Sequence, residues 1–158
     1  IELIRENLTR SEEIVLARID DMRDHGLVFP TPRGGCHTLW ILGHLAFIES
    51  LVVHEFMLGA ESVEPLGETV RWFGGLRRGR SLSTLRGCTQ GVPQRTGFHV
   101  ESFTENDLDR SSANAPAGAE NLFGTYRRCL QYAADHWFMH RGQLADARRA
   151  AGLDRMWF

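Results

Sequence analysis

The C-terminal third of the chain carries an unbroken helical repeat, and this repeat restricts the fold more than any other feature of the sequence. Residues on one face recur at alternating spacings of four and three: Leu122, Tyr126, Cys129, Ala133, His136, His140, Gln143 and Ala147. This spacing is typical of an amphipathic helix that buries one side. We expect the helix to run from Ala119 to Ala151 and to end at Gly152, because glycine is common just beyond helix ends.

Two earlier segments follow the same repeat. The first predicts a helix from Glu2 to Asp24 that stops before Gly26. Its inner residues are expected to be Ile4, Leu8, Ser11, Val15, Ile19 and Met22. The second predicts a helix from Thr38, a candidate N-cap, to Leu58. Its buried face is expected to be Trp40, His44, Phe47, Leu51, His54 and Leu58.

The segment before the last helix differs in composition from the rest of the chain. Residues 69–100 contain six arginines and no acidic residue. Pro93 and several glycines disfavour a helix there, so we expect a shorter third helix only from Phe98 to Leu108. The arginine-rich stretch 75–98 has three interpretations: a basic patch for an anionic ligand, an irregular connection, or a segment out of frame relative to related proteins.

No segment shows a sustained alternation of apolar and polar residues, so the sequence predicts no strands. With four main helices, the expected fold is an all-α four-helix bundle. A chain of 158 residues is long enough to bury one core, and we expect a single domain over residues 1–158.

Composition excludes several functions. The net charge of −2 argues against a protein that binds nucleic acid through its phosphates. Four polar residues interrupt the apolar stretch from Leu39 to Leu58, which predicts a half-buried helix and no membrane span. All 18 basic residues are arginine, which excludes a lysine Schiff base. The three widely spaced cysteines predict free thiols in a reducing cytoplasm.

His136 and His140 are the strongest candidates for chemistry. They are four residues apart, so both imidazoles project from one helical face and can reach one metal ion. His44, which follows Gly43 on the inner face of another predicted helix, is the best third ligand. Three neutral imidazoles would suit Zn²⁺ or Ni²⁺ and leave coordination positions open. The alternative is that these histidines only form hydrogen bonds inside the core.

Other polar residues near these histidines have weaker assignments. Gln143 lies on the same face as the pair. It is expected to orient one of the metal-binding histidines without binding the metal itself, as is Asp135. Asp135 has the competing interpretation of a solvated helix residue. Glu49 is a candidate general base, although it lies off the predicted buried face. His37 is expected at the helix start or the pocket rim, about 10 Å from His44.

These residues carry a family resemblance. The segments LWILGHLAFIE (39–49) and HWFMHRGQLADARRAAG (136–152) are similar to the DinB-like (YfiT-like) superfamily of metalloenzymes. The resemblance implies a bundle with up-down-down-up topology, a homodimer, and a three-histidine metal site at His44, His136 and His140. Stretch 75–98 departs from the family pattern, whereas the three histidines lie outside it.

The resemblance also implies a function. Characterised members include transferases and isomerases that use a low-molecular-weight thiol such as mycothiol or bacillithiol, with a metal that activates the thiol. We therefore expect a metal-dependent transferase or hydrolase acting on a small molecule, without a nucleic acid or membrane partner. The alternatives are a non-catalytic metal-binding stress-response or sensing protein, and a structural helical module with core histidines.

Overall fold

The structure is a computed structural model, and it describes residues 1–26, 28–61, 91–154 and 156. Within these ranges the chain is helical, and no strand forms. The extended contacts of the described residues are two isolated bridges, Thr31 with Gly34 and Ser111 with Thr125. The prediction of an all-α fold is therefore confirmed. The arginine-rich stretch lies mainly at 62–90, outside the described residues.

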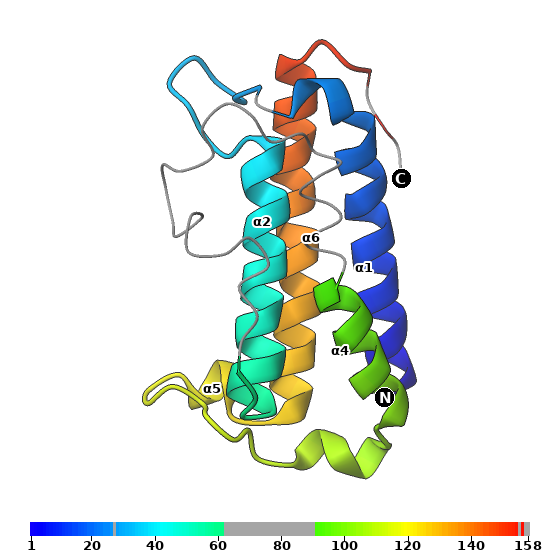
Figure 1. The fold of residues 1–158 in the computed structure, drawn as a ribbon, viewed down its shortest axis with the longest axis vertical. Coiled ribbons are helices and arrows are strands. Elements are labelled where there is room, and N and C mark those ends of the chain that lie inside the picture. Colours follow the sequence, from blue (N-terminus) through cyan, green and yellow to red (C-terminus); the bar gives the residue numbers. More distant parts are fainter. Residues whose placement is uncertain (27, 62–90, 155, 157–158) are drawn as a thin grey trace.

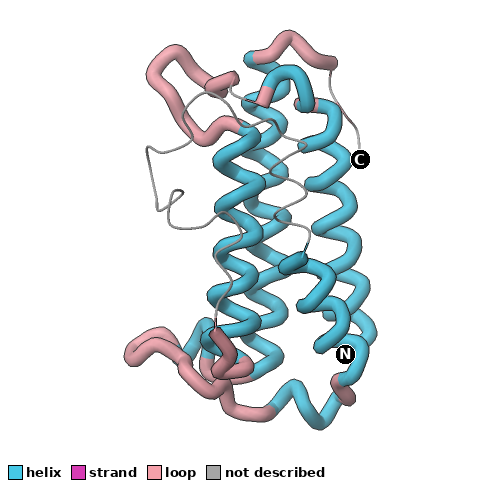
Figure 2. The backbone as a smooth tube through the Cα atoms, in the orientation of Figure 1, coloured by secondary structure: helices cyan, strands magenta, loops and turns pink. Residues whose placement is uncertain are grey.

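The longer helices lie side by side (Figure 1). They are α1 (Glu2–Asp21), α2 (Thr38–Glu49) with its π-helical continuation η2 (Ser50–Met57), α4 (Gly91–Ser102) and α6 (Tyr126–Ala150). Short helices η1 (Arg23–His25), η4 (Glu105–Asp109) and α5 (Glu120–Phe123) join them, with the loops drawn in pink in Figure 2. In Figure 1, α1 and α6 run in one direction and α2 and α4 in the other, which is the order up, down, down, up.

The core is built along α6, which packs against both α1 and α2. One apolar cluster joins the C-terminal half of α1 to α2 and the end of α6, with Val15, Ile19, Leu42 and Leu144 among its buried members. A second cluster joins the start of α1 to η2 and the start of α6.

The helix Thr38–Met57 is apolar and long enough to cross a membrane, but 61% of that window is buried inside the protein. That burial confirms the prediction of a half-buried helix and fits the core helix of a soluble protein.

The buried face of α2 differs from the predicted one. The residues expected inside are only half-buried, apart from His54: Trp40, His44, Phe47, Leu51 and Leu58. The fully buried face instead carries Leu42, Leu45 and Glu49 among others. Because α2 is apolar almost all round, the spacing of its apolar residues cannot distinguish the core side from the partly exposed side.

Four predicted helix boundaries were wrong. The first helix ends at Asp21 and not at Asp24, which lies in the short helix η1. His37, not Thr38, is the N-cap of α2, and its Nδ1 accepts the Trp40 amide at 3.1 Å. The third helix is α4, not Phe98–Leu108, because Pro93 falls in its first turn, where the missing amide costs no hydrogen bond. The last helix is divided at Gly124 into α5 and α6, since Thr125 caps the new helix by accepting the Arg128 amide.

Candidate metal centre

Three imidazoles meet between α2 and α6. The Nε2 atom of His136 lies 3.0 Å from Nε2 of His44 and 3.3 Å from Nε2 of His140. One ring nitrogen from each residue lies within 4.8 Å of the other two. His136 and His140 are buried, whereas His44 is half-buried. The predicted trio is therefore brought together by the fold, with the helical pair on α6 and the third residue on α2.

The geometry of the three nitrogens fits one small metal ion. Nitrogens that lie about 2.0–2.1 Å from a tetrahedral ion are about 3.3–3.4 Å from each other. The separations from Nε2 of His136 to Nε2 of His44 and to Nε2 of His140 are within about 0.3–0.4 Å of that value. Three imidazoles fill only three positions of a four-coordinate site, which leaves one position for water or a substrate atom. The group could therefore hold a divalent ion of the kind used in catalytic sites.

The imidazoles are electrically neutral near neutral pH. Burial is the main cause, and the charges of the neighbouring imidazoles the smaller one, that lowers the pKa of His44 to about 3 and the pKa of His136 to about 4. Burial also lowers the pKa of His140, although its hydrogen bond to Gln143 opposes that shift. Neutral imidazole is the form that binds metal, so these residues need not lose a proton first.

Gln143 is hydrogen-bonded to His140. Its Oε1 lies 2.8 Å from Nδ1 of His140, so Nδ1 donates and Nε2 keeps its lone pair for the centre. The side chain of Gln143 is exposed, yet it sits one turn beyond His140 and reaches back to it. This hydrogen bond is of the kind that an orienting residue would make, and the orienting role of Gln143 stays a prediction.

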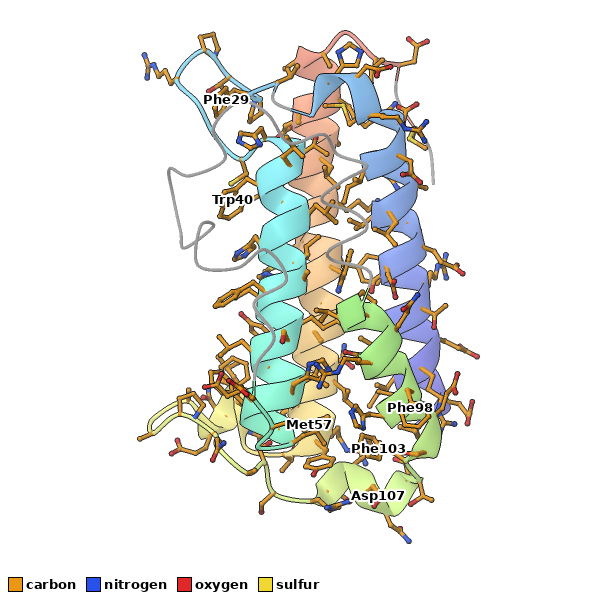
Figure 3. All side chains as sticks on the ribbon, in the orientation of Figure 1. Phe29, Trp40, Met57, Phe98, Phe103 and Asp107 are labelled. Atoms are coloured by element: carbon orange, nitrogen blue, oxygen red, sulfur yellow. The ribbon has the colours of Figure 1, made fainter. Side chains whose placement is uncertain are left out.

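Two aromatic rings fix the other imidazoles. The ring of Trp40 stacks on His44 with centroids 4.5 Å apart and an interplanar angle of 14°. Figure 3 shows Trp40 projecting from the first turns of α2. Tyr132 stacks on His136 at 5.6 Å and 16°. The Nδ1 atom of His136 is buried without a hydrogen-bond partner in the described part of the chain, so the stacked Tyr132 ring and the Nε2 contacts to the other two imidazoles are what hold that ring.

The sequence reasoning missed both aromatic residues as parts of the site. A signal was present, because Trp40 precedes His44 by four residues and Tyr132 precedes His136 by four. That spacing places each ring on the turn next to its histidine.

Asp135 lies apart from the imidazoles. It is exposed, and its Oδ1 accepts a hydrogen bond from Nε2 of Gln131 at 2.9 Å on the same helix. Among the described residues it makes no hydrogen bond to the three histidines. The structure thus places Asp135 where the competing interpretation had it, on the solvated side of α6.

Glu49 faces the interior of the bundle and not the histidines. It is 4% exposed, and its Oε2 accepts the indole N–H of Trp137 at 2.8 Å. Burial raises the pKa of Glu49, and this hydrogen bond only partly opposes that shift. His136 and Trp137 are adjacent on α6 but face different sides of the helix. His136 lies in the metal centre, and Trp137 donates a hydrogen bond to the buried carboxyl of Glu49.

Glu12 of α1 lies near this buried carboxyl. Its pKa is raised to about 7 by burial, and next by the charge of Glu49. A carboxyl whose pKa is higher in the folded chain stabilises the fold at low pH. That contribution is complete below the ordinary value of 4.5 and is lost as the pH rises through about 7. The charged Glu12 side chain therefore destabilises the fold in mildly alkaline solution.

Replacing Glu12 by glutamine is expected to stabilise the protein at alkaline pH. At about pH 8.5 we expect a gain of about 1–2 kcal/mol, less than the pKa shift alone implies because Glu12 is partly exposed. At about pH 5 most of the gain should vanish, since wild-type Glu12 then holds its proton. Urea unfolding at both pH values measures this. The control is Glu6→Gln, an exposed carboxyl on the same helix, and an equal gain from both variants would contradict the prediction.

Comparison with known proteins identifies the family of the chain. A family model described as the DinB superfamily matches residues 7–144, which include all three histidines. The searches of curated proteins and of solved structures found no match to the chain.

Proposed function

Because the chain belongs to the DinB superfamily, we propose that His44, His136 and His140 bind one divalent metal ion, and that the protein is a metal-dependent enzyme. The observation that supports the proposal is the convergence of three neutral Nε2 atoms from two helices. Neutral nitrogen donors favour Zn²⁺ or Ni²⁺ over ions that prefer oxygen ligands. The reaction we propose is the transfer of a low-molecular-weight thiol to a small electrophile, with metal-assisted hydrolysis as the related possibility.

The residues around the centre have separate roles in this proposal. A bound ion would lower the pKa of a thiol or water in its open position and so supply the nucleophile near neutral pH. Gln143 holds the tautomer of His140, and Trp40 and Tyr132 keep two imidazoles in place. These aromatic rings also present apolar surface beside the histidines, which limits the access of water to this side of the centre.

The experiment starts from protein purified without a polyhistidine tag. We expect about one zinc or nickel ion per chain, together with thiol transfer to a model electrophile that stops on chelation and returns when the metal is restored. Several thiols should be compared, because the preferred one identifies the cofactor. His140→Ala should lose both the metal and the activity.

Two results would separate the alternatives. Full metal occupancy without turnover of any thiol or ester substrate would assign a non-catalytic metal-binding or sensing role. No bound metal in wild-type protein would leave the histidines as core residues and would overturn the proposal.

The homodimer, the single domain and the cytoplasmic location stay predictions, as does the absence of nucleic acid and membrane partners. Cys36 and Cys129 are free, which agrees with the expected thiols.

A further inference from the structure

A second polar site lies in a groove between α1 and the C-terminal half of α6. The groove is a pocket of about 560 Å³, and four arginines and two aspartates line it: Arg18, Arg141, Arg148, Arg149, Asp146 and Asp154. Phe138, Leu153 and Met156 supply apolar surface to the same pocket. A pocket with several guanidinium groups and an apolar wall has the general composition of a site for a small organic anion.

Two of these arginines already have acidic partners. Arg148 forms an ion pair with Asp21 and also donates to the backbone carbonyl of Asp154 at 2.7 Å. Arg149 pairs with Asp146, one turn earlier on the same helix. The two carboxylates balance the charges of Arg148 and Arg149. The same contacts hold both side chains in the wall of the pocket.

Arg18 and Arg141 have no such partners in the part of the chain that the structure describes. Arg18 is 3% exposed, and the only hydrogen bond of its side chain there runs from Nη1 to the backbone carbonyl of Ile14 at 2.9 Å. Burial and then the charges of Arg141 and Arg148 lower its pKa. An arginine nevertheless keeps its proton, so a positive charge remains buried among like charges.

We infer that this groove binds an oxyanion group, a phosphate or a carboxylate, of a small molecule whose apolar part lies against Phe138 and Met156. The anion would supply the negative charge that Arg18 lacks. Guanidinium groups form paired hydrogen bonds with the oxygens of both kinds of group, and each such charge-assisted bond is stronger than a neutral one. The site is thus assigned from an unpaired buried charge that opens onto a cavity, not from a cluster of surface charges.

This site is separate from the histidine centre. Ala145 and Arg149 follow His140 by five and nine residues, and in an α-helix those spacings turn the side chains to roughly the opposite face. The ligand of the groove therefore does not occupy the open position of the histidine centre, and the inference does not depend on the proposed metal.

Thermal unfolding in different salts tests the inference on the full chain. Sodium phosphate and sodium succinate are compared with sodium chloride at equal ionic strength, so that general screening by salt cancels. We expect phosphate or succinate, at about ten times its Kd, to raise the Tm of wild-type protein by about 3–6 °C above the chloride value. A response to one salt alone identifies the preferred group as phosphate or carboxylate. Equal Tm values in all three salts would overturn the inference.

Three variants localise the effect. Arg18→Met should abolish the rise, and in chloride it should be at least as stable as wild type because an unpaired buried charge has been removed. Arg141→Gln, at a half-buried residue without an ion pair in the described structure, should weaken anion binding at least fivefold and decides the case if Arg18→Met does not fold. Arg10→Gln is the matched control for Arg18→Met, since Arg10 is exposed on α1, the helix that carries Arg18, and lies outside the pocket. A rise that survives in both Arg18→Met and Arg141→Gln would contradict the site.

Discussion

Replacement of His136 by alanine is expected to reduce bound zinc from about one ion per chain to below about 0.2, because His136 is the central member of the trio. Its Nε2 is the atom that lies within hydrogen-bond distance of both other imidazoles. For wild-type protein, zinc at about a thousand times its Kd should stabilise the fold by about 4 kcal/mol. In a chain of this length that gain corresponds to a rise in Tm of about 8–16 °C, and His136→Ala should show none of it.

A graded set of variants makes this expectation specific. Gln143→Ala keeps all three ligands and loses only the acceptor for Nδ1 of His140, so zinc affinity should fall by about 10–100-fold without loss of the site. His25→Ala is the control, since His25 lies in η1 and belongs to no metal-binding group among the described residues. Elemental analysis and calorimetric unfolding with and without zinc measure both effects. Equal zinc content in His136→Ala and wild type would refute the site.

Replacement of Trp137 by phenylalanine is expected to destabilise the fold by about 2–4 kcal/mol at neutral pH. Phenylalanine fills most of the space of the indole but cannot donate a hydrogen bond to Glu49. The buried carboxyl is then left without that partner, and it is too deep in the core to recover the bond from water. Because burial raises the pKa of Glu49, the loss should be smaller in acid, where the carboxyl is neutral, than at alkaline pH.

A double-mutant cycle separates the hydrogen bond from the change in volume. The cycle combines Trp137→Phe with Glu49→Leu. The double variant should cost about 1 kcal/mol less than the sum of the two single variants, which is within the range for residues in direct contact. Trp40→Phe is a control for the loss of an indole at a half-buried position. Urea unfolding at about pH 5 and about pH 8 measures the free energies. A loss for Trp137→Phe below about 0.5 kcal/mol would show that the Glu49 hydrogen bond contributes little.

Helix spacing predicted the metal-centre candidates well where a helix has one apolar side. On α6 the repeat assigned His136 and His140 to a common face, and both are buried there. On α2 the same reasoning placed His44 on the side that faces α6, but it wrongly called that side the buried core. The helix is apolar on nearly every side, so only tertiary contacts decide which side is enclosed.

The remaining errors have local causes that a repeat does not detect. Leu122 fits the spacing of α6 but belongs to α5, because the break at Gly124 leaves the spacing intact. Thr125 indicates the start of a new helix in the sequence, because threonine is favoured at the N-cap position. The start of α4 was missed because Pro93 was weighed as a helix breaker and not as a first-turn residue. The Glu49–Trp137 hydrogen bond joins two helices and depends on their packing, which spacing alone does not encode.

The π-helical segment η2 has a consequence for how this chain tolerates changes in length. A π-helix places more residues in each turn than an α-helix does, so η2 holds surplus backbone inside an otherwise continuous rod. Deleting one residue between Ser50 and Met57 would let this part rewind as an α-helix and would leave α2, with Trp40 and His44, in its place against α6. The same deletion between His44 and Glu49 would rotate His44 by about 100° relative to η2. We therefore expect a one-residue deletion to be tolerated in η2 and not in the part of the helix between His44 and Glu49.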